Sequence, residues 1–193
     1  MRLILASASP RRAELLRAAG LDFEVVVRQI DESSRPFEAA PAYVQRLASE
    51  KAEAAMGAVR EPSAVVLAAD TAVVVDGDIL GKPRDDADAA AMLRRLSGRR
   101  HEVMTGVCLR GTDFEFMRVE TTAVYVAALS EVDVAWYVAS GEGRDKAGAY
   151  AIQGLASRFI PRIEGSYTNV VGLPVECVVR ALADFRRRLP DPQ

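Results

Sequence analysis

The sequence has little of the chemistry on which many enzymes depend, with one histidine and two cysteines among 193 residues. A single histidine, His101, argues against a histidine-ligated zinc site and against a Ser-His-Asp triad, and we interpret it as structural. Cys108 and Cys177 each stand alone in an apolar run. This pattern predicts buried free thiols rather than a disulfide or a metal site.

Long apolar runs and an excess of one charge are also missing. No run reaches the roughly 18 apolar residues that a membrane helix needs, and Met1 leads into a predicted strand rather than a signal peptide. The 25 basic and 27 acidic residues give a net charge of −2, which argues against a surface for nucleic acid polymers. We expect a cytoplasmic protein whose residues 1–193 form a single domain, with one core or a core divided into two lobes.

The common phosphate-binding motifs are absent too. There is no Gly-x-x-x-x-Gly-Lys-Ser/Thr run, and Lys82 between Gly81 and Pro83 lacks the glycine-rich lead of such a loop. No Gly-x-Gly-x-x-Gly follows a predicted strand, so a dinucleotide-binding fold is unsupported. A phosphate site in this chain must therefore be built in another way.

The N-terminal segment offers a candidate phosphate site of another kind. An apolar strand at residues 3–5 ends in small residues that include Ser7, and Ser9 and Pro10 suit the first positions of a helix. The start of a helix favours an anion, and the guanidinium groups of Arg11 and Arg12 suit phosphate. On this segment alone, a phosphate site and an ordinary basic surface patch both remain open.

Two charged residues interrupt apolar patterns. Lys51 falls within about 20° of Val44 on the apolar stripe of a helix predicted over residues 41–56, where it must snorkel to solvent, pair with a carboxylate or face a polar cleft. Asp70 ends one apolar strand run just before another begins, so we place it at a strand end. A carboxylate there needs a cation, and both a structural ion pair and a role as general base or Mg²⁺ ligand remain open.

Lys82 adds a third charge. It follows a hairpin signal at Asp76-Gly77, which keeps it on the same hairpin as Asp70. Together the candidate cations are Arg11, Arg12, Lys51 and Lys82, and the candidate acids are Glu32 and Asp70. This balance suits a polyphosphate that binds with a divalent cation.

The remaining elements predict a mixed α/β fold. Strands are expected at residues 23–27, 64–69, 72–75, 101–109, 114–126 and 159–163, and helices at residues 10–19, 41–56, 85–96, 131–140 and from 174. Because strands and helices interleave irregularly, a mixed sheet flanked by helices is favoured over a uniformly wound parallel sheet.

In its motifs the chain resembles the Maf family of nucleoside triphosphate pyrophosphatases over nearly its whole length. The motifs, in order, are Ser7-Ala8-Ser9-Pro10-Arg11-Arg12, Ala69-Asp70-Thr71, Gly81-Lys82-Pro83-Arg84, the run Asp145-Lys146-Ala147-Gly148-Ala149-Tyr150-Ala151-Ile152-Gln153-Gly154 and Val170-Val171-Gly172-Leu173-Pro174. The resemblance implies a twisted sheet in two lobes around a deep nucleotide-binding cleft, similar to that of inosine triphosphatases, usually in a homodimer.

The resemblance also implies an activity. A nucleoside triphosphate is hydrolysed between its α and β phosphates, giving the monophosphate and pyrophosphate, with Mg²⁺ or Mn²⁺ as cofactor. The positions that match the family's active-site residues are Ser7, Arg11, Arg12, Glu32, Lys51, Asp70 and Lys82, with Asp70 at the proposed proton acceptor. Ser9 belongs to the same phosphate-binding segment, and Asp70 and Glu32 are the candidate metal ligands.

Three residues, Arg11, Thr71 and Gln153, resemble the branch of the family that prefers dTTP and UTP. An amide such as that of Gln153 can donate and accept, which suits the O4 and N3–H edge of uracil or thymine. The expected function is that of a house-cleaning enzyme that removes dTTP and UTP from the nucleotide pool, with modified pyrimidine nucleotides as further candidate substrates. The alternatives are a nucleotide-sensing regulator of septum formation without significant turnover, or a phosphomonoesterase, which the lack of a nucleophile motif disfavours.

Overall fold

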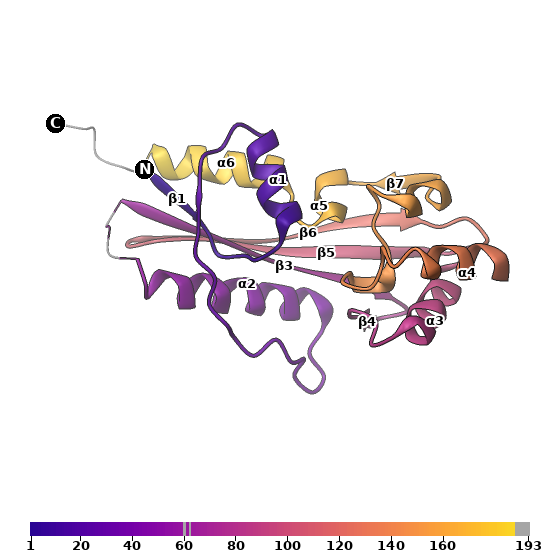
Figure 1. Cartoon of the computed structure of the whole chain (residues 1–193). Helices are drawn as coiled ribbons and strands as arrows, with labels where there is room; N and C mark the ends of the chain where they lie inside the picture. The colour runs from indigo at the N-terminus through magenta and orange to yellow at the C-terminus, as the bar shows by residue number, and fades with distance from the viewer. Residues whose placement is uncertain (60, 62, 188–193) are drawn as a thin grey trace. The chain divides into compact units, whose positions relative to one another are not determined.

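The computed structural model describes residues 1–59, 61 and 63–187, and within them the chain forms a mixed α/β fold (Figure 1). The strands are β1 (Arg2–Leu5), β2 (Glu24–Val25), β3 (Ala64–Val75), β4 (Asp78–Leu80), β5 (Arg100–Gly111), β6 (Phe114–Tyr125) and β7 (Arg162–Glu164). They form a seven-stranded sheet in the order β2-β1-β3-β5-β6-β7, with β4 paired to β3. Strand β1 runs parallel to β2 and β3, whereas β4 and β7 pair antiparallel, which confirms the predicted mixed sheet.

The helices are α1 (Pro10–Ala18), α2 (Ala40–Met56), α3 (Asp86–Leu96), α4 (Glu131–Ala139), α5 (Tyr167–Val171) and α6 (Val175–Arg186), with 3₁₀ turns η1 (Ala147–Ala149) and η2 (Leu155–Phe159). Within the described part of the chain, no helix is both long and apolar enough to cross a membrane.

The chain divides into two compact units. Unit 1 contains Met1–Asp70, Thr105–Glu120 and Gly172–Gln193, and unit 2 contains Thr71–Met104 and Thr121–Val171. Each unit has an apolar core of its own. The assignment of residues 1–193 to one domain, and the cleft between two lobes, remain predictions.

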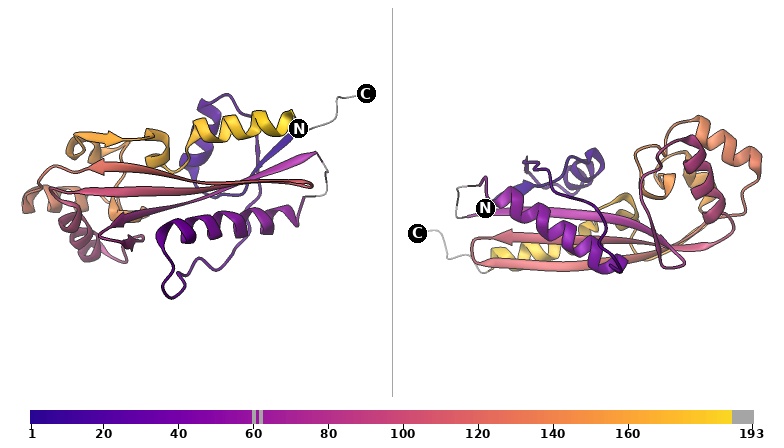
Figure 2. Two further views of the ribbon diagram at one scale, coloured as in Figure 1. Left: turned by 180° about the vertical axis from the view of Figure 1, so that it is seen from behind. Right: turned by 90° about the horizontal axis from the view of Figure 1, so that it is seen from below.

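In unit 1 successive side chains of β3 point to opposite faces of the sheet, and this alternation divides the core into two layers. Val66 and Ala68 pack with Ala48 and Ala52 of α2, whereas the odd-numbered residues of the same strand pack with α1 and α6. Figures 1 and 2 show α2 on one side of β1 and β3, and α1 and α6 on the other. Gly106 of β5 is required for this packing, because a Cβ there would lie 2.2 Å from the carbonyl oxygen of Val44.

Unit 2 contains the predicted hairpin turn and two helices with capped N-termini. Asp76 and Gly77 both have positive φ angles, 54° and 85°, as the two-residue hairpin between β3 and β4 requires. The side chain of Asp85 caps α3, and Ser130 forms a capping box with Asp133 at the start of α4. The predicted hairpin at Asp76-Gly77 is therefore confirmed.

His101 and the cysteines are structural, as predicted. His101 is 2% exposed, and its Nε2 lies 2.8 Å from the hydroxyl of Tyr150 in unit 2, whereas its Nδ1 is buried without a hydrogen-bond partner among the described residues. Burial lowers the pKa of His101 to about 4, so the ring is neutral at neutral pH. Cys108 and Cys177 are buried free thiols.

Three predicted boundaries were wrong. Strand β3 runs without a break from Ala64 to Val75, so Asp70 lies inside a strand and not at its end. The strand expected at residues 23–27 is reduced to Glu24–Val25, and the strand expected at residues 159–163 begins only at Arg162, after a 3₁₀ turn that ends at Phe159. The first of these matters for the site, because the strand can continue through Asp70 only if its carboxylate has a partner.

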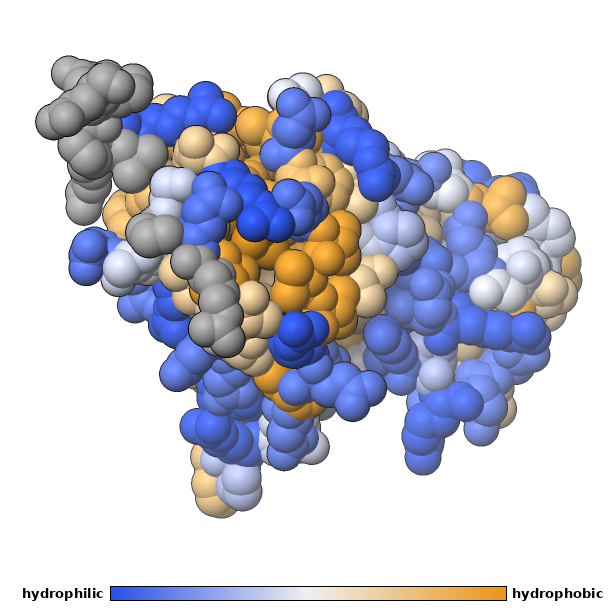
Figure 3. All heavy atoms as spheres, turned by 60° about the vertical axis from the view of Figure 1, so that its left-hand side comes forward, coloured by the Kyte–Doolittle hydropathy of each residue, from blue (hydrophilic) through white to orange (hydrophobic). Residues whose placement is uncertain are grey.

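Some apolar side chains reach the surface. Val25, Val27 and Val179 of unit 1 are exposed, and Figure 3 shows one face on which hydrophobic residues gather among hydrophilic ones. Exposed apolar residues are ordinary on protein surfaces, so they do not by themselves indicate a binding site.

Candidate active site

The segment before α1 fixes a buried arginine. Arg12 is 9% exposed; its Nε donates to the carbonyl oxygen of Gly172 at 2.8 Å, and its Nη1 donates to Oγ of Ser7 at 3.0 Å. Ser7 is buried as well, and its Oγ also accepts from the backbone N–H of Ser9 at 3.3 Å. The Arg12 guanidinium is therefore held in one orientation at the start of α1.

Ser9 and Arg11 complete this segment. Ser9 occupies the N-cap position of α1 as predicted, with Pro10 next to it, but its side chain makes no capping hydrogen bond. Arg11 is half-buried in the first turn of the helix. The segment therefore places two serines and two arginines around a helix N-terminus, where an anion is favoured.

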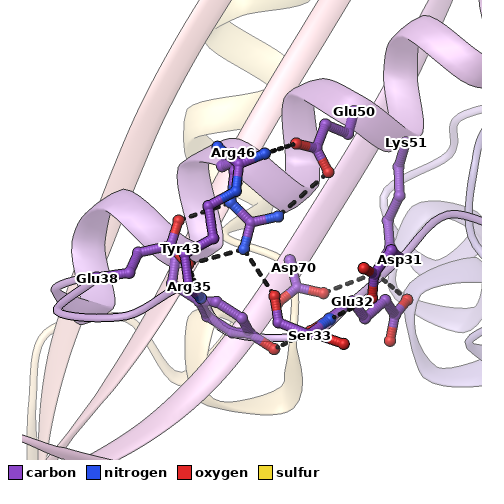
Figure 4. A network of polar contacts seen from close by, with 10 residues as sticks. All are labelled: Asp31, Glu32, Ser33, Arg35, Glu38, Tyr43, Arg46, Glu50, Lys51 and Asp70. Atoms are coloured by element: carbon purple, nitrogen blue, oxygen red, sulfur yellow. Dashed lines mark hydrogen bonds and ion pairs between the residues drawn. The ribbon is translucent and has the colours of Figure 1, made fainter.

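Lys51 joins two carboxylates. Its Nζ lies 2.6 Å from Oδ1 of Asp70 and 2.7 Å from Oε1 of Glu32, as Figure 4 shows. The side chains of Lys51 and Asp70 are only 14% and 12% exposed, whereas that of Glu32 is 56% exposed. Lys51 thus pairs with carboxylates instead of snorkelling to solvent, and Asp70 has the cation that it needs inside β3.

The geometry follows from the sheet and the helix. Asp70 continues the row of Val66 and Ala68, which faces α2, and Lys51 lies next to Ala52 on the side of α2 that packs against this row. The ion pair between Lys51 and Asp70 therefore explains why a lysine is tolerated on the apolar stripe of α2 and an aspartate on the apolar strand β3.

Arg12 interacts with the same charges. Burial lowers the pKa of Arg12, while attraction from Asp70 and Glu32 opposes that effect. The pKa of Tyr43 in α2 is raised by burial, and the same two carboxylates raise it further. Arg12, Lys51, Glu32 and Asp70 therefore form one cluster of mixed charge within unit 1.

This cluster fits a divalent cation that arrives with phosphate. The described residues contain no group of three or more His, Cys, Asp or Glu side chains that could enclose a metal. Glu32 and Asp70 nevertheless present carboxylate oxygens to one point, at Lys51 Nζ. Magnesium is commonly bound by one or two carboxylates, with water and substrate phosphates as its other ligands.

The other predicted site residues lie in unit 2. Thr71 follows Asp70 in β3 and is half-buried, Lys82 is exposed just beyond β4, and Gln153 is exposed between η1 and η2. The N–H of Gly148 donates to the carbonyl oxygen of Gly81 at 3.0 Å, so the segments that carry Lys82 and Gln153 are joined directly.

Tyr137 and Glu142 hold the segment of Gln153 from both sides. The hydroxyl of Tyr137 accepts from the N–H of Ala151 at 3.1 Å and donates to Oε2 of Glu142 at 2.7 Å. Oε1 of Glu142 accepts from the N–H of Leu155 at 2.9 Å. The backbone is thus anchored two residues before and two residues after Gln153, while the Gln153 side chain stays exposed.

Comparison with known proteins identifies the family. The profile of the family described as Maf-like protein matches residues 2–185. The chain belongs to the Maf family. It is 52% identical over 183 residues to a protein of Symbiobacterium thermophilum named dTTP/UTP pyrophosphatase, covering 95% of this chain and 93% of the relative.

A second relative of the same name, from Anaeromyxobacter sp. (strain Fw109-5), is 54% identical over 194 residues, covering 98% of this chain and 92% of the relative. Among solved structures, the Ham1 protein of Staphylococcus aureus matches with a TM-score of 0.56 and 14% identity, over 96% of this chain and all of that one. This likeness shows that the Maf chain and the Ham1 protein share a fold.

The structure of this Maf chain brings together the predicted residues of unit 1 and adds others. Tyr43, Arg46 and Glu38 form polar contacts beside Glu32 and were missed, although Tyr43, Arg46 and Glu50 share a side of one helix at a spacing visible in the sequence. Tyr137 and Glu142 were missed because their partners are backbone N–H groups, for which the sequence carries no signal.

Proposed function

We propose that this chain hydrolyses dTTP and UTP to the nucleoside monophosphate and pyrophosphate. The observation that carries the proposal is the cluster in which Lys51 lies between Glu32 and Asp70, with Arg12 buried beside it. The relatives named dTTP/UTP pyrophosphatase support it, because they are 52% and 54% identical over nearly the full length.

The cations of the site have a clear task. Ser7, Ser9, Arg11 and Arg12 would bind phosphate oxygens at the start of α1, and Arg12 is already held by the contacts to Ser7 and Gly172. Lys51 and Lys82 would neutralise further charge on the triphosphate. Fixed cations stabilise the charge that develops as the bridging P–O bond breaks and pyrophosphate leaves.

The carboxylates would hold the cofactor and the water. Glu32 and Asp70 are the residues that would hold Mg²⁺ or Mn²⁺, and the cation would supply further neutralisation of phosphate charge. Asp70, buried beside Lys51, would accept a proton from the attacking water.

Base selection would fall to Arg11, Thr71 and Gln153. The Gln153 amide can match the O4 acceptor and N3–H donor of uracil and thymine, provided that its backbone is held still. The contacts of Tyr137 and Glu142 supply that anchorage. Modified pyrimidine nucleotides with the same edge are further candidate substrates of a house-cleaning enzyme. A homodimer and a cytoplasmic location are part of this proposal.

A nucleotide panel tests the proposal. The wild-type chain is incubated with dTTP, UTP, CTP and GTP in the presence of Mg²⁺, and pyrophosphate is resolved from orthophosphate. We expect pyrophosphate from dTTP and UTP in preference to the others. Orthophosphate as the product would indicate a phosphomonoesterase, and tight nucleotide binding without turnover would favour the sensing regulator.

A further inference from the structure

The connection from β2 to α2, residues 26–39, carries Glu32 but has little to hold it. It contains no helix or strand, and residues 31–37 are all exposed, with Phe37 at a positive φ of 60°. The segment is called the Glu32 loop below. Since it buries little apolar surface, the hydrophobic effect contributes little to fixing its position.

Polar contacts from α2 hold this loop instead (Figure 4). Tyr43 donates its hydroxyl hydrogen to the carbonyl oxygen of Glu32 at 3.1 Å, and Nη2 of Arg46 donates to the carbonyl oxygen of Ser33 at 3.0 Å. The two backbone carbonyls at and next to Glu32 are therefore both bound to α2.

The contact between Arg46 and Glu38 is the most enclosed of these. Nε and Nη2 of Arg46 donate to the two carboxylate oxygens of Glu38 at 2.6 and 2.7 Å, and the two side chains are 13% and 9% exposed. Such paired bonds fix orientation as well as distance. They also lower the pKa of Glu38 to about 2, so the carboxylate is ionised at neutral pH.

Arg46 also links the loop to a second carboxylate of α2. Its Nη1 donates to Glu50 at 3.2 Å, and Glu50 in turn accepts from Arg35 of the loop at 3.1 Å. Tyr43, Arg46 and Glu50 lie on one side of α2, at the three- and four-residue spacing of helical neighbours, and Lys51 directly follows Glu50 in the chain. Glu50, which binds the loop through Arg35, is therefore the immediate chain neighbour of Lys51, which binds Glu32 of the same loop.

We propose that Arg46 is a positioning residue, which through Glu38 and the carbonyl of Ser33 holds the Glu32 loop so that the Glu32 carboxylate meets Lys51. Glu32 is more than half exposed, so its burial does not place it there. This inference rests on the proposed function only for the role of Glu32 in turnover. The holding of the loop can be measured without substrate.

The first experiment measures the loop itself, by amide hydrogen exchange in wild type, Arg46→Met and Glu38→Gln. We expect faster exchange within residues 31–38 in both variants. Arg94→Met is the matched control, because Arg94 also donates Nε and Nη2 to a glutamate, Glu131, but between α3 and α4 in unit 2. Unchanged exchange in both variants of the Glu32 loop would overturn the proposal.

The second experiment is a double-mutant cycle on turnover of UTP. We expect Arg46→Met to lower kcat/KM at least about tenfold in wild type, since displacement of a functional group is costly, and to have little further effect in Glu32→Gln. Arg94→Met should leave kcat/KM unchanged. If Arg46→Met instead lowers kcat/KM by the same factor in Glu32→Gln as in wild type, Arg46 acts on something other than Glu32, and the proposal is overturned.

The two experiments separate two failures. If wild type releases no pyrophosphate from any nucleotide, the proposed function is wrong, and hydrogen exchange still decides whether Arg46 holds the loop. A second result is possible when wild type is active and hydrogen exchange is faster in Arg46→Met. If the effects of Arg46→Met and Glu32→Gln on kcat/KM are then independent, the proposed function stands and the link between Arg46 and Glu32 fails.

Discussion

The two units hold their exposed site segments by different means. In unit 1 the Glu32 loop is bound by ion pairs from Arg46 and by Lys51, so most of its anchors carry charge. In unit 2 the segment of residues 150–155, called the Gln153 loop below, has Tyr150 and Ile152 buried in the core, and two of its N–H groups are bound by Tyr137 and Glu142.

This difference matches the work proposed for each segment. Charged anchors surround residues that would meet phosphate and a cation, where the electrostatic field itself is useful. Around Gln153, burial and directional hydrogen bonds fix a neutral amide, and a neutral amide can distinguish one base edge from another only if its orientation is fixed. Variants that disrupt the charged anchors of unit 1 or the hydrogen bonds of unit 2 test this difference.

Asp70→Asn should lower kcat for UTP by about 10²- to 10⁴-fold, the range for loss of a general base, while the fold is kept. The amide is nearly the same size but cannot accept the proton or bind a cation well. Steady-state kinetics with circular dichroism as a check on folding would measure this. Activity within tenfold of wild type would remove Asp70 from the mechanism.

Lys51→Met should lower kcat/KM by about 10²-fold, because one fixed cation is lost from the site. It should also lower the free energy of unfolding by about 1–3 kcal/mol, because Asp70 is left nearly buried without its nearest cation. Urea titration would measure the second effect.

The double variant Lys51→Met/Asp70→Asn sharpens that test. An amide needs no counterion, so we expect the double variant to regain stability while it remains inactive. If the double variant is no more stable than Lys51→Met, the contact between Lys51 and Asp70 contributes little to the fold, and its role is confined to the site.

The sequence was sufficient to predict the site residues that interrupt a local hydrophobic pattern. Lys51 interrupts an apolar helix stripe and Asp70 an apolar strand run, and each is charged where the pattern calls for an apolar side chain. The structure explains both anomalies by one contact. The charge of Asp70 also caused the error in the strand prediction. A break was expected at Asp70, but the contact with Lys51 lets β3 continue through it.

The sequence was insufficient where side chains bind distant backbone. Glu142 lies between two glycines and contacts the N–H of Leu155, 13 residues further on, and Tyr137 reaches the N–H of Ala151. Neither contact leaves a periodicity or a motif in the chain. Arg46 was missed for a related reason, because a charged residue on a helix is ordinarily a solvent-exposed one.

Gln153→Ala should lower kcat/KM for UTP and dTTP about tenfold or more, which corresponds to loss of hydrogen bonds worth about 1–3 kcal/mol to the base. The loss for poor substrates such as GTP should be much smaller, and the melting temperature should not change because the side chain is exposed. Equal proportional losses for all nucleotides would show that Gln153 does not select the base.

Tyr137→Phe should have the smallest effect on turnover and the clearest effect on selection. Removing the hydroxyl leaves the N–H of Ala151 without this partner and loosens Glu142, so the Gln153 loop should be held less firmly. Burial, aided by Glu142, raises the pKa of Tyr137, so the phenol stays protonated and its loss is the loss of a neutral hydrogen-bonding group. We expect the preference for UTP over CTP to fall severalfold, with stability reduced by about 1–3 kcal/mol.

Tyr125→Phe is the matched control, because the hydroxyl of Tyr125 also donates to a glutamate of unit 2, Glu164, at 3.0 Å, but in a hydrogen bond that is exposed to solvent. It should change neither stability nor the UTP to CTP ratio. The ratio is measured from kcat/KM for each nucleotide, so a general loss of folded protein cancels. If Tyr137→Phe lowers stability and leaves the ratio unchanged, Tyr137 supports the core of unit 2 only, and the orientation of Gln153 is fixed by other contacts.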